Sequence, residues 1–344
     1  MVTSLCFGDP HFHTNNIYNI EIAMTETIAL TRKLNPTFVV ILGDVLHEHN
    51  IIHTPAYKLA VTWIELLSRI CHVYVLIGNH DYIDHTQFLT DNHIFGPLKK
   101  WPRVTIVDEV IVNTWGGYKF TFCPYVEPGR FEEALNTIGE SWKDSTCIFA
   151  HQEFRGAKFG GKISEDGDSW ASDLPPVISG HIHEAQIVNE NIYYTGSLMQ
   201  HAQGDTGEKN MWLLQFSGNT WQYFLYQFQN LKPRKTIKIK ISEFEEFDLS
   251  VADTCYLRLI LTGTNEEKKV CKISKKYKDN TTPDVRSKNG LAITFETKND
   301  KNTNEKVEMS REFITFENIL ANLIKDKSTI VQNAYNSLVS KGIL

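Results

Sequence analysis

Residues 38–47 read FVVILGDVLH, five apolar residues followed at once by Gly43, Asp44 and, three residues beyond the aspartate, His47. A short, continuous apolar run is typical of a strand that is buried on both faces of a sheet. The glycine permits a tight turn directly after that strand. Because binding crevices of open α/β sheets lie where strands end, Asp44 and His47 stand where a functional site is expected.

An apolar run followed by a polar motif occurs five times in the first 185 residues. In chain order the motifs are Gly8-Asp9-Pro10-His11, Gly43-Asp44-Val45-Leu46-His47, Gly78-Asn79-His80-Asp81, Ala150-His151 and Gly180-His181-Ile182-His183. One such motif alone is weak, since an isolated Gly-Asp or Asn-His pair is usually an ordinary turn. Five in succession indicate loops that meet at one edge of a sheet. Their Asp, Asn and His side chains offer oxygen and nitrogen ligands suited to Mn²⁺, Fe²⁺ or Zn²⁺.

Helical patterns and further apolar runs fill the segments between these motifs. The periodicity predicts helices over Ile17–Leu34 and Thr54–Ile70. From about residue 103 the apolar runs come closer together, which predicts a mixed sheet or a two-sheet sandwich. The strands predicted after Phe38–Leu42 are Val73–Ile77, Val104–Val107, Val110–Val112, Tyr118–Phe122, Cys147–Ala150, Val177–Ser179, Ile192–Tyr194, Met211–Phe216 and Trp221–Phe228.

The composition is that of an ordinary globular protein, with 42% hydrophobic and 22% charged residues in a chain of 344. The start, MVTSLCFGDPHFH, has no basic segment followed by a long apolar stretch, so we expect no signal peptide. The longest apolar runs are about five residues, against the about 20 that span a bilayer. The six cysteines are scattered without a CxxC pair. We therefore expect reduced thiols in an intracellular protein, of cytoplasm or nucleus, with no membrane partner and no structural zinc finger.

Histidine and charge are unevenly distributed. All 13 histidines lie at or before His201. Residues 1–230 carry 14 basic and 25 acidic side chains, a balance of −11, whereas residues 231–344 carry 21 and 16, a balance of +5. This division suggests that chemistry and partner contacts lie in different parts of the chain.

The pattern changes after Pro233. Strands are predicted at Thr236–Ile241, Tyr256–Leu261 and Leu291–Glu296, and two short helices at Phe313–Ile324 and Thr329–Val339. The basic run Lys268–Lys278 is either a contact for a phosphate backbone or a plain solvated face. The apolar stripe within residues 313–324 either packs on the preceding domain or docks on a partner. We therefore divide the chain into residues 1–232, 233–300 and 301–344.

The ordered set of five motifs resembles the calcineurin-like metallophosphoesterase superfamily, over about residues 1–200. The resemblance implies an α/β fold in which a two-sheet sandwich is flanked by helices. It also implies two divalent metal ions, which lower the pKa of a bound water and neutralise the phosphate oxygens. Carried over to this chain, the first ion would be held by Asp9, His11, Asp44 and His183, and the second by Asp44, Asn79, His151 and His181. His80 would face the scissile phosphate, and Asp81 beside it could orient that imidazole.

A narrower resemblance is carried by GDVLHEH at residues 43–49. It is similar to the GDLFH segment of the SbcD-like nuclease subunit of double-strand-break repair complexes, in which the histidine at the position of His47 contacts phosphate. The segment Ile192–Ser197 resembles a strand and turn of that family, with Thr195 in place of proline. The resemblance implies a nuclease domain at residues 1–232, a small α+β cap domain that guides DNA at 233–300, and a linker with C-terminal helices at 301–344. Those helices would dock on the coiled coil of an SMC-like ATPase.

Two positions depart from the superfamily pattern. His13 stands where the first motif usually ends in glycine, and Ala150 stands where glycine usually precedes the histidine of the fourth motif. Neither change removes a ligand. His13 is either a substrate contact or a histidine of a solvated loop. By analogy, the Thr54–Ile70 helix and the segment after Asp81 would form a homodimer interface.

These observations favour a two-metal phosphodiesterase that acts on DNA in repair or processing, as an exonuclease with some endonuclease activity and with Mn²⁺ as its metal. Three alternatives remain. A small-molecule or cyclic-nucleotide phosphoesterase has no need of the about 110 residues after the boundary, and a Ser/Thr phosphatase would have Arg after GNHD, where Tyr82 stands. A non-catalytic scaffold usually lacks ligands, and here all seven are present. The acidic first part is compatible with DNA, because two divalent ions offset its charge at the site.

Overall fold

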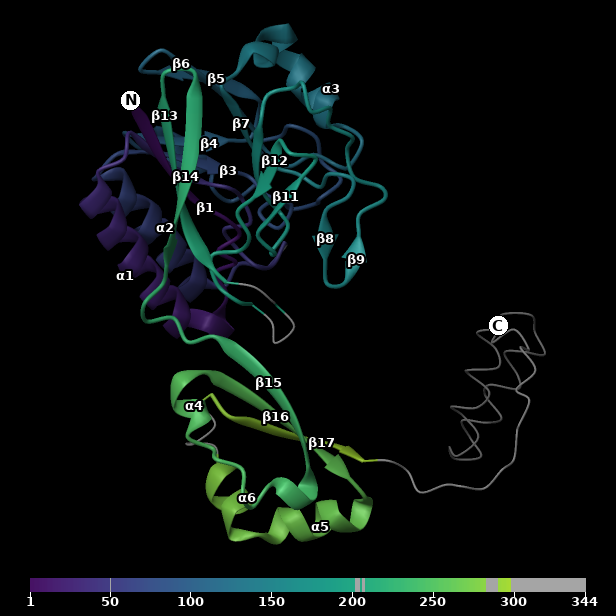
Figure 1. Cartoon of the computed structure of the whole chain (residues 1–344). Coiled ribbons are helices and arrows are strands. Elements are labelled where there is room, and N and C mark those ends of the chain that lie inside the picture. Colours follow the sequence, from purple (N-terminus) through teal and green to yellow (C-terminus); the bar gives the residue numbers. More distant parts are fainter. Residues whose placement is uncertain (50, 202–204, 206–207, 283–289, 298–344) are drawn as a thin grey trace, which may run out of the picture. The chain divides into compact units, whose positions relative to one another are not determined.

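The computed structural model describes residues 1–49, 51–201, 205, 208–282 and 290–297 (Figure 1). Contacts group residues 1–297 into one compact unit. The predicted boundary at residue 232 falls between two sheets of that unit, and it stays a prediction. The two helices predicted within residues 301–344, with their proposed partner docking, lie outside the described residues.

The first large sheet contains the FVVI strand at its centre. Its four parallel strands are β1 (Val2–Phe7), β2 (Phe38–Ile41), β3 (His72–Leu76) and β4 (Val104–Val107). Antiparallel strands extend it beyond β1, in the order β14-β13-β1-β2-β3-β4, and they are β13 (Asn210–Ser217) and β14 (Thr220–Gln227). All four residues of β2 are buried, as an unbroken apolar strand between two covered faces requires.

The second large sheet has the order β11-β12-β10-β7-β6-β5. Its strands are β5 (Ile111–Trp115), β6 (Tyr118–Cys123), β7 (Cys147–His151), β10 (Val177–Gly180), β11 (Gln186–Val188) and β12 (Ile192–Tyr194). The four central strands run parallel and the two edge strands antiparallel. Five of the parallel strands, β1, β2, β3, β7 and β10, end in the motif loops. The two-sheet sandwich predicted from the sequence is confirmed.

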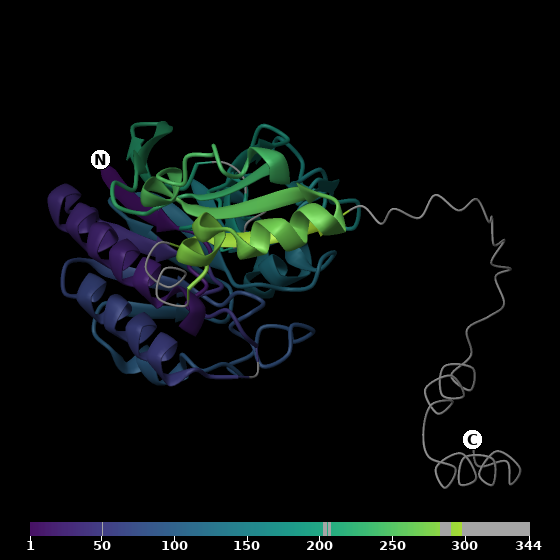
Figure 2. The ribbon, with the colours of Figure 1, turned by 90° about the horizontal axis from the view of Figure 1, so that it is seen from below.

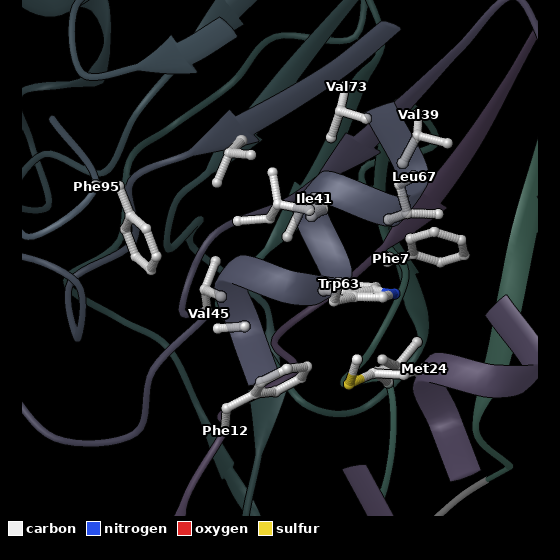
Figure 3. Close-up of a cluster of buried hydrophobic side chains, with 14 of the residues drawn as sticks. Phe7, Phe12, Met24, Val39, Ile41, Val45, Trp63, Leu67, Val73 and Phe95 are labelled. Carbon is white, nitrogen blue, oxygen red and sulfur yellow. The ribbon is translucent and has the colours of Figure 1, made fainter. Parts of the chain in front are cut away.

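Side chains of alternate residues in a strand point to opposite faces of the sheet, so the two faces of the first sheet pack against different layers. Phe38 and Val40 pack with Phe122 and Phe149 of the second sheet in one buried cluster. Phe7, Val39 and Ile41 face the opposite side, where they pack with Met24 and Trp63 of the helices (Figure 3). The two layers of the core therefore lie on either side of β2.

Two long helices cover the outer face of the first sheet, α1 (Ile17–Leu34) and α2 (Thr54–Ser68), and they lie side by side (Figure 2). Trp63 of α2 is fully buried, and its Nε1 donates to Thr27 Oγ1 of α1 at 2.9 Å. The predicted second helix extended two residues further, to Ile70. Shorter elements lie in the connections: α3 (Phe131–Leu135), the hairpin of β8 (Lys158–Phe159) and β9 (Lys162–Ile163), and 3₁₀ turns at Thr14–Asn16, Gly96–Lys100, Asn136–Asp144 and Ile241–Glu243.

A small sheet follows residue 233, with strands near the three predicted positions, and these strands run parallel. Its strands are β15 (Arg234–Lys240), β16 (Tyr256–Gly263) and β17 (Ala292–Thr297), and its helices are α4 (Val251–Thr254), α5 (Asn265–Ile273) and α6 (Lys275–Asn280). Leu257, Leu259 and Leu261 of the central strand form its own buried core with Cys271 of α5. The basic run Lys268–Lys278 therefore lies on α5 and α6.

All six cysteines are free and buried, as the scattered spacing predicts. Within the described residues, none of the helices combines the length and apolar character that crossing a membrane requires.

Candidate metal centre

The five motif loops meet at the carboxyl ends of β1, β2, β3, β7 and β10. Four of the predicted ligands there have a left-handed backbone, namely Asp9 (φ 40°), His11 (φ 42°), Asp44 (φ 49°) and His181 (φ 79°). Such a conformation is strained for residues with a side chain, costs about 1–3 kcal/mol at each position, and clusters at functional sites. The neighbouring Gly78 is required for a different reason. A Cβ there would lie 2.2 Å from Asp44 Oδ1, so only glycine leaves room for that carboxylate.

The first predicted ligand set is brought together by these loops. His11 Nε2 lies 3.0 Å from His183 Nε2 and 3.5 Å from Asp44 Oδ2. Asp9, His11 and His183 offer ligand atoms that all lie within 4.8 Å of one another. Two atoms that bind one ion at about 2.1 Å can be at most about 4.2 Å apart, so the separations from His11 suit a shared metal.

The second predicted set is assembled around Asn79. Its Oδ1 lies 3.0 Å from His151 Nε2 and 2.9 Å from His181 Nδ1. His151 Nε2 is in turn 3.4 Å from Asp44 Oδ1. Asp44 therefore turns one carboxylate oxygen to each set, which is the arrangement that a bridging ligand requires.

An unpaired polar atom at this site fits a metal ion. Asp9 Oδ2 is buried and has no hydrogen-bond partner among the described residues. An unpaired buried polar atom costs about 1–3 kcal/mol, so native proteins rarely leave one. Asp9 Oδ2 lies among imidazoles and accepts no hydrogen bond, so a bound cation would supply the partner that this carboxylate oxygen needs. The chemistry of the set, imidazole nitrogen with carboxylate and amide oxygen, is that of divalent transition metals.

The electrostatics favour the neutral, metal-binding form of the imidazole at His11 and His183, but not at His151. Burial lowers the pKa of His11 well below its ordinary value, and it lowers that of His183 to about 4. Burial opposes ionisation of Asp44, but the charge of His151 and a hydrogen bond from it hold the pKa of Asp44 well below its ordinary value. Burial acts against protonation of His151 too, yet Asp44 raises the pKa of that imidazole to about 9. The centre therefore combines one firmly ionised carboxylate with neutral and charged imidazoles.

His80 and His47 lie on the accessible side of the centre. His80 Nδ1 donates to the carbonyl oxygen of His47 at 2.6 Å, and its backbone N–H donates to Asp44 Oδ1 at 2.9 Å. The two rings stack with centroids 5.9 Å apart, and the ring of His47 is 5.2 Å from that of His11. His80, His11 and Asp44 also offer ligand atoms within 4.8 Å of one another, so the geometry alone permits His80 to bind metal.

The role suggested for Asp81 requires correction. Its carboxylate accepts the backbone N–H groups of Val45, Leu46 and Gly78, at 3.2, 3.0 and 3.0 Å. It therefore ties the turn after β2 to the turn after β3, and the group that holds the His80 imidazole is the His47 carbonyl. Burial raises the pKa of Asp81 to about 7. Asp81 is thus a residue that shapes the site and does not orient His80.

Residues that the motifs did not identify also surround the centre. The Nε2 atom of His201 lies 2.9 Å from the Asp9 carbonyl oxygen, and its ring is 4.8 Å from that of His11. Lys209 donates to the His183 carbonyl oxygen and to Ser197 Oγ, at 2.7 and 2.9 Å. His201 and Lys209 both follow β12 in the chain, at positions that match no motif. Their proximity to the metal centre is therefore seen only in the folded chain.

A second histidine cluster lies beside the centre. His13 Nε2 and His53 Nε2 lie 3.0 and 3.1 Å from the two oxygens of Glu48. His13 Nδ1 accepts the backbone N–H of Asn15, so Nε2 carries the proton of the neutral ring and donates to Glu48. His13 therefore caps a 3₁₀ turn and joins a hydrogen-bonded array, which needs no ion.

Comparisons with known proteins agree with this geometry. Residues 2–185 match the family model described as calcineurin-like phosphoesterase. The chain is 39% identical over 276 residues to "Putative phosphoesterase 244L" of Invertebrate iridescent virus 6, a match that covers 79% of this chain and 97% of that protein. It is also 39% identical over 273 residues to "Putative phosphoesterase 078R" of Invertebrate iridescent virus 3, covering 77% and 78%.

A solved structure, that of GAP50, the anchor in the inner membrane complex of Plasmodium, aligns with 67% of this chain and 85% of its own. Its TM-score of 0.41 and sequence identity of 13% are too low to bear on function. The family match covers the strands and loops that carry the candidate metal centre. The chain therefore belongs to the calcineurin-like phosphoesterase family, whose members hydrolyse phosphoesters with divalent metal ions.

Proposed function

We propose that this protein is a Mn²⁺-dependent phosphodiesterase that degrades DNA. The observation that carries the proposal is a pair of cavities that are each lined by residues of the metal-centre motifs and share no lining residue. One, of about 330 Å³, is lined by His181, His183 and Phe159. The other, of about 240 Å³, is lined by His80, His49 and Ile83. A phosphodiester has a substituent on both sides of its phosphorus atom, and a monoester on one side only, so two cavities suit a diester.

The residues around the centre have separate tasks in this reaction. When bound, the two divalent ions supply an activated water at neutral pH and neutralise the phosphate oxygens. His80 Nδ1–H is held by the His47 carbonyl, which leaves Nε2 as the nitrogen that can act on substrate; it is 4.0 Å from Asp44 Oδ2. Protonated at Nε2, His80 can donate to the leaving oxygen. The exposed His47 ring stands beside it, where an imidazole can hydrogen-bond to a phosphate oxygen.

The test compares substrates with the metal held constant. With Mn²⁺, the protein is expected to degrade linear DNA and bis(p-nitrophenyl) phosphate far faster than p-nitrophenyl phosphate or a cyclic nucleotide. Asp9→Asn, purified in the same way, measures contaminating nuclease. Equal DNA degradation by Asp9→Asn, or none by the wild type with any divalent metal, would contradict the proposal. Cleavage of the cyclic nucleotide alone would favour the small-molecule alternative.

The basic run of the small sheet supplies further contacts for DNA in this proposal. Lys269, Lys275 and Lys278 are exposed on α5 and α6. Lys276 is used within the domain, since its Nζ donates to the carbonyl oxygens of Glu245 and Phe247 at 2.7 Å each. The docking of an SMC-like ATPase is proposed for residues 301–344.

A homodimer is also part of the proposal. Ile51, Ile52 and Ile83 have exposed side chains, with 59%, 49% and 48% of their surface accessible. They flank α2 and the segment after Asp81, where the dimer interface is expected, and apolar side chains at an exposed surface suit a protein contact. Sedimentation at micromolar concentration should give the mass of two chains, and Ile51→Asp, which changes a side chain outside the cavity of about 240 Å³, should shift it toward one. A wild-type monomer at that concentration would contradict the dimer.

A further inference from the structure

The β8–β9 hairpin forms one wall of the cavity of about 330 Å³, the larger of the two described beside the metal centre. Lys158 pairs with Ile163, and Phe159 pairs with Lys162. Gly160 and Gly161 make the two-residue turn, and both have left-handed backbones (φ 53° and 81°). Turns of this kind match the twist of the two strands and require such a backbone, so Gly-Gly favours a defined hairpin.

The side chain of Gln186 fixes this hairpin to the loop that carries two predicted ligands. The backbone N–H of Lys158 donates to Gln186 Oε1 at 2.8 Å, and Gln186 Nε2 donates to the Lys158 carbonyl oxygen at 2.7 Å. Gln186 follows His183 by three residues. The amide therefore pairs with the hairpin edge as another strand would, and it sets the distance between Phe159 and the metal centre.

The hairpin presents an aromatic ring and two cations beside that centre. Phe159 is 40% exposed and lines the cavity of about 330 Å³ together with His181 and His183. Lys158 and Lys162, its neighbours along and across the hairpin, are exposed. An exposed aromatic ring next to a basic side chain is the combination with which proteins hold single-stranded nucleic acid.

The charge of the cavity selects which part of a nucleotide can enter. Glu184 and Asp205 are among its lining residues. Carboxylates repel a phosphate, but they accept hydrogen bonds from the ring and amino N–H groups of a base. The lysines of the hairpin lie outside the cavity lining, where they suit the phosphates on either side of that base.

We propose that this cavity binds one nucleobase next to the scissile phosphate, with the base stacked on Phe159. The proposal rests on the proposed function in taking DNA as the substrate, and it assigns the neighbouring nucleotide to a defined position. A base in this place would determine how the strand crosses the metal centre.

The test removes each partner of the stack separately and then both together. The wild type and Phe159→Ala are compared, with Mn²⁺, on a single-stranded oligonucleotide and on two versions with an abasic residue on the 5′ or the 3′ side of one cleavage site. One of the two abasic strands should lower the wild-type kcat/KM about tenfold, the size of effect expected for the loss of a stacking partner. Phe159→Ala should lower it by a similar factor on the normal strand, with little further loss on the abasic strand. Phe159→Trp should restore the difference.

Ile163→Ala is the matched control, because Ile163 is 60% exposed on the same hairpin and is not among the residues that line the cavity. It should distinguish normal from abasic strands as the wild type does. The proposal would be overturned if Phe159→Ala distinguished normal from abasic strands as strongly as the wild type does. It would also be overturned if the wild type had the same kcat/KM on the normal strand and on both abasic strands. A wild type that cleaves no DNA would instead show that the proposed function is wrong.

Discussion

Asp44→Asn is expected to lose both metal ions and to lower the rate of phosphodiester hydrolysis by at least about a thousandfold, which corresponds to about 4 kcal/mol of lost transition-state stabilisation. Asp44 Oδ2 lies 3.5 Å from His11 Nε2, and Oδ1 lies 3.4 Å from His151 Nε2. Asparagine keeps the shape of the side chain but offers one oxygen in place of two, and it has no charge. The metal content of purified protein, measured by elemental analysis, and the hydrolysis rate check this result.

Asp84→Asn is the matched control for this experiment. Asp84 is an exposed aspartate in the loop after the third motif, and its carboxylate accepts hydrogen bonds from Thr86. The same chemical change there should leave two ions per chain and the wild-type rate. Added Mn²⁺ should raise the Tm of the wild type and of Asp84→Asn, because a ligand that binds only the folded state stabilises it. Two ions and full activity in Asp44→Asn would show that Asp44 does not bridge.

His80→Ala is expected to lower kcat by about 10²- to 10⁴-fold while the protein keeps two metal ions, since this is the range contributed by a proton-transfer group. The substitution retains the backbone N–H that donates to Asp44 Oδ1 at 2.9 Å, so the turn should keep its shape. It removes only the imidazole on the accessible side of the centre. The hydrolysis rate with saturating Mn²⁺ and the metal content separate the two possible effects.

His72→Ala is the control for the loss of an imidazole elsewhere. His72 lies at the start of β3, the end of that strand away from the motif loop, and its Nε2 is 2.9 Å from Thr105 Oγ1. It should keep full activity. Loss of one ion from His80→Ala would show that His80 is a ligand with His11 and Asp44, a grouping that their separation permits.

Much of the fold was predictable because buried strands and the buried faces of helices require apolar residues at regular positions in the sequence. The FVVI strand is buried on both faces and is accordingly apolar at every position. The helices at residues 17–34 and 54–68 show the spacing of one buried face, with Trp63 and Met24 directed to the core. The sheet after Pro233 was also recognised from its apolar strands. Some predicted elements differed at their ends, such as the two residues by which α2 is shorter, where fraying and capping decide between similar energies. Short elements were missed altogether, among them β11 and the helices α5 and α6.

The predicted ligand residues were recognisable because each lies at the end of a strand or within four positions after it, so local sequence places them. What they touch could not be predicted. The Asp81 carboxylate was expected beside the His80 ring, but it binds three backbone N–H groups from two turns. His201 and the Phe159 hairpin come close to the centre through segments whose local sequence does not fix their position relative to it.

The sequence by itself determined which strands are buried and which polar residues stand at their ends, because both follow from the order of neighbouring residues along the chain. Only the tertiary structure decided how those ends face one another. It places one carboxylate, Asp44, between two sets of ligands, and it brings His201 and Phe159 to the same centre. The reason is that these contacts join separate segments of the chain, in the cases of Asp44 with His151 and His11 with His201 over 100 positions apart. Their distances depend on how two sheets pack and on turns held in strained conformations.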